Sequence, residues 1–535
     1  MDSIKTKSYK ATAATDKNSE RKDGKNRFRF GALEVASFLC GAAVMVLEMA
    51  GSRVIAPYMG TSLVVWTALI GVIMASLSAG YWLGGVAADF RPDQKVLARI
   101  VLLASFCTGF LALFANPILT FLSKTISSVY ISSVFAALLL FALPSVLLGM
   151  VSPFIVRLAM RDVGSSGKTV GRFSALSSTG SILGTFLGGF VLISVFAAGT
   201  ILLLVAFTLT VVALLLYRSI WKKANVLCVA FLMLVAGTKL WGMPMMPIGE
   251  HVDTAYNHIW IAEQTRPNGR RARFLMTAAV GEGAQSIIYT DNPSELVSDY
   301  TKFYDLAFYY NPGVQKILML GGGGYCVPRH LVATHVNEAR FPTFSMDIVE
   351  IDPGITKVAR KYFDLRDSPA LSVYHEDARS YLNRAVRNPN LAGSYDAVFA
   401  DVFASWYTIP FHLATVEAAE NMSKLLAPNG VLVSNVISSL RGPKSGVFHG
   451  IYAALSQVFP RVLIFPASRP EAPFAQARQN IMIVAFKSVD ELPILPPYDP
   501  EISRLLSHRW MEPFTPSIPP FTDAFAPVER YALME

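Results

Sequence analysis

The chain has 535 residues, of which 53% are hydrophobic and 16% are charged. This composition is too apolar for an ordinary soluble enzyme, so a part embedded in a membrane is expected. The formal net charge of +9 does not indicate nucleic-acid binding, because much of the basic excess lies beside apolar segments, where membrane topology accounts for it. The four cysteines show neither a disulfide framework nor metal-ligand spacing, and no metal is expected.

The first half of the chain predicts a membrane domain. Residues 1–29 are polar and basic, and we expect a disordered tail that can touch anionic lipid. Residues 30–245 are expected to form a polytopic α-helical domain, because they hold seven apolar segments long enough to span a bilayer. These segments are 33–50, 63–88, 97–115, 131–156, 174–196, 199–217 and 225–243.

The loops between these segments alternate in charge. Basic residues occur near 91–95, 157–172 and 218–223, whereas 51–62 and 197–199 are poor in them. The tail and the basic loops are therefore predicted to be cytoplasmic. Six spans would return the chain to the cytoplasm, and a seventh would place the globular part outside. With six or seven helices both open, either 225–243 lies in the interface or re-enters the membrane, or the globular part is external.

Glycines recur at every fourth residue within two of the spans, at Gly180, Gly184 and Gly188 and at Gly80 and Gly84. Small residues at this spacing let two helices approach closely. The segment 174–196 is therefore predicted to be a packing helix.

A small β-hairpin subdomain is predicted over residues 250–310. Residues 256–263 and 273–277 alternate between apolar and polar side chains, and 266–269 have the composition of a turn. Residues 285–289 predict one more strand.

Residues 311–490 predict an α/β Rossmann-like domain, followed by a proline-rich extension, 491–535. Successive predicted strands end in Gly321–Gly324, in Glu350 and Asp352, in Asp377 and in Asp401, and a helix at 412–427 leads through a turn at 428–430 into a further strand. In an open parallel sheet such strand ends converge on one crevice. The glycines allow close approach of a nucleotide, and an acid after the next strand suits its ribose. Each acid alone could be an ordinary helix N-cap, but the series favours a nucleotide site.

Several motifs then carry a resemblance over about residues 255–487. They are YNHIWIAEQ (256–264), the triple glycine 321–323, VEID (349–352), EDAR (376–379), YDAVFAD (395–401) and KLLAPNGVLVSN (424–435). Together they resemble the spermidine synthase branch of the class I S-adenosylmethionine-dependent transferases. The apolar half resembles the membrane part of fused transporter-like/spermidine synthase proteins.

The resemblance implies the site residues. It implies that S-adenosylmethionine or its decarboxylated form is the donor and that no metal is needed. The residues it assigns to the nucleotide are Gly321, Gly322, Gly323, Glu350, Asp352, Asp377, Ala378 and Gln285. It makes Asp401 the catalytic residue, which accepts a proton from the attacking amine or orients it. Tyr300 would face the acceptor. The aromatic loop with Trp406 and Tyr407 departs from the family pattern and could instead cover a less charged substrate, such as one delivered from the membrane. Because this nucleotide is made inside cells, we expect a multi-pass protein of the inner or plasma membrane with a cytoplasmic transferase domain.

Two departures from the family pattern bear on the substrate. Gly324 stands where the family has an acid that holds the amino end of the donor, and Ala404 stands where a second acid holds the diamine. We therefore expect aminopropyl transfer to an amine, with methyl transfer by the same fold as the alternative. A transporter or sensor that binds the nucleotide without turnover is a third reading. The acceptor and the formation of a homo-oligomer are left open.

Overall fold

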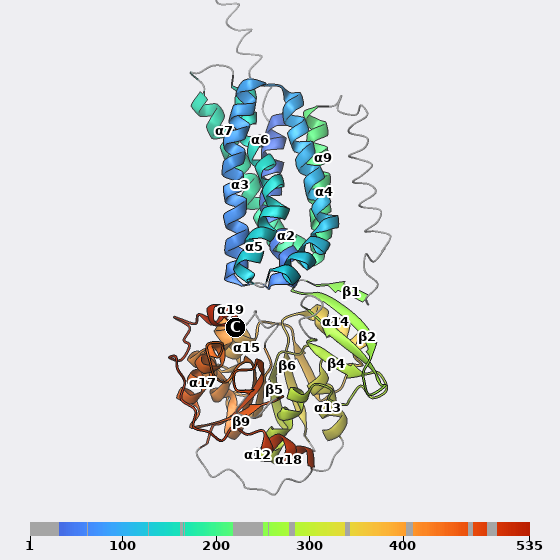
Figure 1. Cartoon of the computed structure of the whole chain (residues 1–535), viewed down its shortest axis with the longest axis vertical. Helices are drawn as coiled ribbons and strands as arrows, with labels where there is room; N and C mark the ends of the chain where they lie inside the picture. Colours follow the sequence, from blue (N-terminus) through green and yellow to red (C-terminus); the bar gives the residue numbers. More distant parts are fainter. Residues whose placement is uncertain are drawn as a thin grey trace, which may run out of the picture.

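A computed structural model describes most of the chain as a helical bundle and an α/β domain, which are stacked along the long axis (Figure 1). The described residues are 31–60, 62–126, 128–160, 164, 166–217, 250–254, 256–277, 284–336, 343–402, 410–468, 474–488 and 500–534. The predicted tail 1–29, the predicted span 225–243 and the loop residues Trp406 and Tyr407 lie outside them.

Within the described residues, six helices are long and apolar enough to cross a membrane. They are α2 (Ala32–Met59), α3 (Leu63–Phe90), α4 (Gln94–Thr125), a helix over Val129–Ala159 (α5, a π-helical turn and α6), one over Ser166–Leu192 (α7 and a π-helical turn) and α9 (Ala198–Leu216). They contain six of the seven predicted spans. The prediction of a loop at 51–62 is wrong for most of its length, because α2 continues to Met59 with Val54 and Ile55 buried against its neighbours.

Two helix pairs pack through glycine. A Cβ atom on Gly180 would lie 2.0 Å from the backbone oxygen of Phe38, and one on Gly80 would lie 2.3 Å from that of Val146. Such distances leave no room for a side chain, so α7 packs directly on α2, and α3 packs on α6. Gly188 differs, since its Cβ would meet only ordinary contacts near 3.7 Å. The packing role predicted for 174–196 is thus confirmed for its first two glycines.

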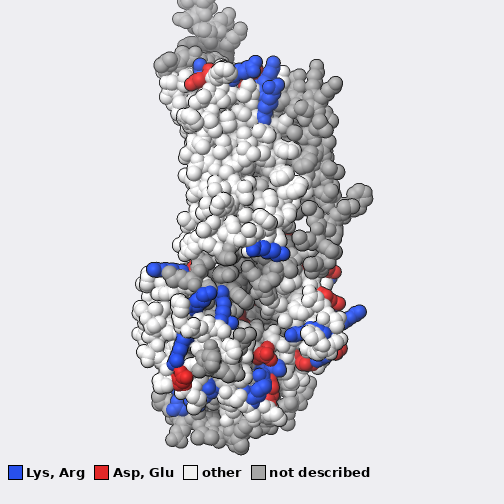
Figure 2. Space-filling view, viewed as in Figure 1, with Lys and Arg blue, Asp and Glu red and all other residues white. Residues whose placement is uncertain are grey.

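The two ends of the bundle differ in charge and in what they adjoin. Helix α2 begins, and α9 ends, at the end remote from the α/β domain (Figure 1). The described basic residues near 91–95 and 157–172 follow or precede helices at this same remote end, where Lys and Arg gather in Figure 2. If the bundle spans a membrane, the start of α2 and the α/β domain lie on opposite sides of it. We expected both the N-terminal tail and the α/β domain to be cytoplasmic, and this arrangement does not allow both.

A four-stranded antiparallel sheet begins the globular part, in the order β1-β2-β3-β4. Its strands are β1 (Glu250–Asp253), β2 (His258–Thr265), β3 (Arg271–Met276) and β4 (Ser286–Tyr289). The β2–β3 hairpin closes through Gly269, which has a positive φ of 79° and donates its N–H to Arg266. This is the predicted hairpin, with β1 added beside it.

A seven-stranded sheet forms the centre of the α/β domain, with the order β10-β11-β9-β8-β5-β6-β7. Its strands are β5 (Lys316–Leu320), β6 (Ser345–Val349), β7 (Leu371–Tyr374), β8 (Tyr395–Ala400), β9 (Leu426–Ser438), β10 (Arg461–Pro466) and β11 (Gln479–Phe486). Strands β5 to β9 are parallel, whereas β11 runs antiparallel to both β9 and β10. This arrangement confirms the Rossmann-like fold.

Apolar side chains cover both faces of this sheet. One core includes side chains from α11 (Asp299–Lys302), α12 (Leu306–Tyr310), α13 (Cys326–His335), α14 (Pro353–Tyr362) and α18 (Pro500–Ser507). The other includes side chains from α15 (Ala378–Ala385), α16 (Val416–Leu425), α17 (Gly446–Val458) and α19 (Val528–Met534). The described part of the C-terminal extension is therefore folded into the domain.

The turn predicted at 428–430 needs a correction. These residues lie inside β9, which begins at Leu426, and the β8–β9 register shifts between Tyr395 and Ala397. Residues 428–430 form an irregularity in the pairing of β8 with β9 and not a turn that separates a helix from a strand.

Candidate active site

The register of the parallel strands brings four predicted or newly found residues into one row. Leu320 is paired with Val349 on β6 and with Ala400 on β8, and Ala400 is paired with Ser434 on β9. The residues that follow these positions are Gly321, Glu350, Asp401 and Asn435. Because the strands are parallel, all four lie at the carboxyl edge of the sheet, where ligands bind in such folds.

The glycine loop is held against the end of β8. The Asp401 N–H donates to the Leu320 carbonyl at 2.9 Å, and a Cβ atom on Gly321 would lie 2.1 Å from the Asp401 carbonyl oxygen. Gly321 also has a positive φ of 90°. Only glycine satisfies both conditions, so the loop and the predicted catalytic residue are fixed relative to each other.

Glu350 connects the loop to β6. Its Oε2 accepts the N–H groups of Gly322 at 2.8 Å and Gly323 at 3.1 Å, and its Oε1 accepts that of Asp352 at 2.9 Å. Burial raises the pKa of Glu350, and these three N–H groups oppose the rise. The carboxylate is therefore held in position by the backbone at the wall of the cavity.

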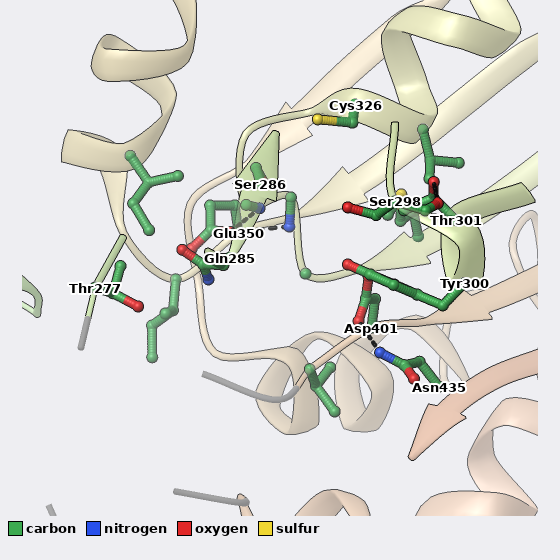
Figure 3. Close-up of a pocket in the computed structure, with 18 of the residues that line it drawn as sticks. Thr277, Gln285, Ser286, Ser298, Tyr300, Thr301, Cys326, Glu350, Asp401 and Asn435 are labelled. Atoms are coloured by element: carbon green, nitrogen blue, oxygen red, sulfur yellow. Dashed lines mark hydrogen bonds between the residues drawn. The ribbon is translucent and has the colours of Figure 1, made fainter. Parts of the chain in front are cut away.

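Asp401 is surrounded by neutral polar side chains. Asn435 donates its amide N–H to Oδ1 of Asp401 at 3.0 Å, and Asn480 donates to Asn435 at 3.0 Å. In Figure 3 the Tyr300 hydroxyl points towards the Asp401 carboxylate. Burial raises the pKa of Asp401, and Asn435, Tyr300 and Tyr304 oppose the rise by stabilising the charged form. A carboxylate with a raised pKa can accept a proton near neutral pH.

A cavity of about 260 Å³ lies in front of this row. The predicted residues that line it are Gly321, Gly322, Gly323, Glu350, Asp377, Ala378, Gln285, Tyr300 and Asp401. Its described lining holds three carboxylates, those of Glu350, Asp377 and Asp401, and neither lysine nor arginine. The buried Oε1 of Gln285 has no hydrogen-bond partner in the described structure. The cavity is thus rich in acceptors and suits a cationic ligand.

Asp377 and Asp352 lie differently. Asp377 caps α15 through the Ser380 N–H at 2.9 Å and contacts His412 at 3.2 Å through its other oxygen, at the wall of the cavity. Asp352, expected at the nucleotide, is fully buried and is not among the lining residues.

The oxygens of Asp352 serve the structure instead. Oδ1 accepts the Gly354 N–H at 2.8 Å and so caps α14, while Oδ2 accepts bonds from Thr254 at 2.5 Å and Asn257 at 2.8 Å. Asp352 therefore attaches the segment between β1 and β2 to the Rossmann-like domain. The structure therefore does not bring Asp352 into the cavity with the other residues predicted to hold the nucleotide.

Gly324 has no space for the acid that the family carries. A Cβ atom there would lie 2.6 Å from the Cβ of Ser286, and the Gly324 N–H donates to Ser286 Oγ at 2.8 Å. Ser286 on β4 thus occupies the position of a side chain at residue 324. The glycine at position 324, in place of the family's acid, is therefore required by the packing of β4 against the glycine loop.

The polar lining residues that sequence reasoning missed include Ser286, Ser298, Asn435 and Asn480. Asn435 follows an apolar strand and could have been singled out by the same rule as Asp401. Asn480 lies on an antiparallel strand near the sheet edge, so only the register of β9 and β11 reveals it.

Comparisons with known proteins point to transferases of two kinds. The polyamine aminopropyltransferase of Vibrio vulnificus is 36% identical over 165 residues, which are 30% of this chain and 52% of the relative. The human eEF1A lysine and N-terminal methyltransferase is 27% identical over 150 residues, 27% of this chain and 21% of the relative. This chain therefore spans about half of the first relative's length. No protein-family model matches it.

Solved structures give the same two kinds of protein. A probable spermidine synthase from Corynebacterium glutamicum has a TM-score of 0.39 and 21% identity, covering 49% of this chain and 87% of that one. Human methyltransferase-like protein 13 in complex with SAH has a TM-score of 0.30 and 22% identity, covering 39% and 90%. The strand order and register described above, rather than these scores, define the fold. By sequence, the α/β domain is thus similar to aminopropyltransferases and to methyltransferases.

Proposed function

We propose that the α/β domain transfers an aminopropyl group from decarboxylated S-adenosylmethionine to an amine. The observation that carries this proposal is the charge of the cavity, whose described lining has three carboxylates and no lysine or arginine. A sulfonium donor and an amine are both cationic or readily become so, and they suit such a site. The carboxylate of intact S-adenosylmethionine would find no cation there.

The reaction needs no metal, because a neutral thioether leaves. The lone pair of the amine attacks the aminopropyl carbon bound to sulfur, the C–S bond breaks, and its electron pair stays on sulfur as methylthioadenosine departs. The new ammonium group gives its proton to Asp401, whose pKa is raised by burial. Tyr300 and Asn435 fix the carboxylate so that donor and acceptor are held in line.

Methyl transfer is the second candidate, and Gly324 favours it. Without an acid at this position, the amino end of a decarboxylated donor loses a charge-assisted hydrogen bond of about 1.5–3 kcal/mol. The unpartnered Oε1 of Gln285 offers a replacement acceptor, because Gly323 lies close to that side chain. Because Gln285 Oε1 can take the place of the missing acid as a hydrogen-bond acceptor, aminopropyl transfer remains our first proposal.

Product analysis separates the two. Purified full-length protein is given either donor with amines and lipid extract, and nucleotide products are identified by mass spectrometry, with Asp401→Asn as control. Methylthioadenosine formed from the decarboxylated donor by the wild type alone supports the proposal. S-adenosylhomocysteine would assign methyl transfer. Bound nucleotide without either product would favour the sensor or transporter reading.

The charge of the bundle also suggests where the reaction occurs. The end next to the α/β domain is poor in Lys and Arg, whereas the basic loops lie at the other end. By the positive-inside rule this distribution supports a non-cytoplasmic α/β domain, which we propose. This is the opposite of the placement that we expected from the supply of the donor.

A further inference from the structure

A second cavity, of about 390 Å³, lies between the bundle and the α/β domain. We define it as the junction chamber. Its bundle side includes residues of α2, α4 and α9, among them Leu111, Ala112, Ala115, Ile201 and Leu202. Its other side is formed by the β1–β2 region, with Asp253, Thr254, Tyr256, His258 and Trp260. One wall is thus apolar and the other polar, as an amphipathic ligand requires.

The junction chamber adjoins the candidate active site. Asn257, Thr277 and Ile351 line both cavities. Ile351 directly follows Glu350, and its side chain is 40% exposed although it is large and apolar. A molecule in the chamber therefore lies one layer of residues away from the nucleotide cavity.

The two sides of the chamber carry opposite signs of charge, with Arg53 on the bundle side and Asp253 on the β1–β2 side. Arg53 on α2 lies within electrostatic range of Tyr256 and Asp352 across the junction, but it forms no hydrogen bond or ion pair with a described residue. Asp253 contacts His258 on the opposite wall. An unpaired guanidinium suits a phosphate, and a nearby carboxylate suits an amine. A free polyamine, which carries only positive charge, is a poorer match beside Arg53.

We propose, resting on the transferase function above, that the acceptor is a membrane lipid whose headgroup contains a phosphate and a primary amine. The headgroup occupies the junction chamber with its phosphate at Arg53, and its chains pass along α4 and α9. Its amine reaches past Ile351 to the donor and is the nucleophile that Asp401 deprotonates. The missing acids at Gly324 and Ala404 agree with an acceptor that is held by its headgroup and chains.

The test uses full-length protein in nanodiscs of phosphatidylcholine, with or without phosphatidylethanolamine, and with putrescine as the soluble alternative. Each donor is supplied in turn, and the mass of the lipid and amine products is measured. We expect phosphatidylethanolamine to gain the transferred group and putrescine to remain unmodified. Modification of putrescine in lipid-free detergent, with phosphatidylethanolamine unchanged, would overturn the proposal and leave the transferase function standing.

Substitutions on one helix locate the site. Ala198→Trp at the start of α9 places a large side chain in the junction chamber, whereas Leu204→Trp changes a position that is 40% exposed on the bundle surface. We expect Ala198→Trp to lower lipid modification by about tenfold or more, and Leu204→Trp to stay within about twofold of the wild type. Arg53→Gln should raise KM for the lipid in a protein that still folds. Equal lipid turnover by the wild type, Ala198→Trp and Arg53→Gln would refute the assignment.

Lipid retention gives a readout that does not need turnover. Native mass spectrometry should show phosphatidylethanolamine, in preference to phosphatidylcholine, retained by the wild type and by Leu204→Trp and lost from Ala198→Trp. If no acceptor yields product with either donor, the transferase proposal fails, and this measurement still decides whether the chamber binds lipid. Equal retention of phosphatidylethanolamine by all three proteins would refute lipid binding in the junction chamber.

Discussion

Gly324 allows the sharpest test of the site's packing. Replacing it with alanine brings a Cβ within 2.6 Å of the Ser286 Cβ and 2.8 Å of its Oγ. Ser286 is buried and also accepts the Gly324 N–H, so the overlap cannot be relieved by a free rotation of the side chain. Overpacking of this kind costs about 1–3 kcal/mol. For a domain of this size, each kcal/mol lowers Tm by roughly 2–4 °C.

The measurement is thermal unfolding of the full-length protein in detergent. Gly313→Ala is the matched control, because its Cβ would meet only Asn311 Oδ1, at 3.4 Å. Ser286→Gly alone should also destabilise, since it leaves the Gly324 N–H without its acceptor, at about 1–3 kcal/mol. In the double variant Gly324→Ala/Ser286→Gly the clash is absent, so the combined loss should be smaller than the sum. Additive losses, or a Gly324→Ala protein as stable as Gly313→Ala, would refute this account of the missing acid.

Three further predictions concern the proton acceptor, the topology and the bundle. Tyr300→Phe removes a hydroxyl that lowers the pKa of Asp401, the proposed general base. The acidic limb of the pH profile of kcat/KM should therefore move to higher pH. An unchanged acidic limb would contradict the role of Asp401 as the base. Asp89 and Asp367 are both exposed, so each can be replaced by cysteine in a protein whose native cysteines have been removed. An impermeant maleimide should label the two variants from opposite sides of the membrane, and Asp367→Cys from outside in intact cells. Labelling of both variants from one side would exclude a spanning bundle. Gly180→Val should destabilise the bundle strongly, because its Cβ would lie 2.0 Å from the backbone oxygen of Phe38. Gly189→Val should be tolerated, because a Cβ there would have nothing within 4 Å. Equal yields of folded protein from the two variants would argue against direct contact of α2 and α7.

The sequence predicted those features that depend on one strand and its end. Asp401 and the triple glycine could be placed because an apolar run stops at each of them, and parallel strands align such ends. Asn435 could have been found by the same rule, whereas Asn480 needed the register of β9 and β11, which periodicity does not contain. The roles of Gly324 and Ser286 depend on a contact between β4 and the glycine loop, 38 residues apart, and no local pattern indicates it.

Asp352 and Arg53 show a different limit. Asp352 looks like a ribose ligand by its position after β6, yet its oxygens are occupied by a helix cap and by the β1–β2 segment. Arg53 falls within the predicted loop 51–62, but α2 continues through it. In both cases tertiary contacts decided between two local structures that the sequence allows.

The attachment of Asp352 to Thr254 and Asn257 has a consequence for protein engineering. These bonds join the β1–β2 segment, which lines the junction chamber, to the start of α14 beside the nucleotide cavity. A chimera that exchanges the bundle and hairpin subdomain with those of a related protein therefore has to carry all three residues as a matched set. If the set is split, Oδ2 of the buried Asp352 loses the donors Thr254 and Asn257, and the two halves lose their alignment even though each retains its own core.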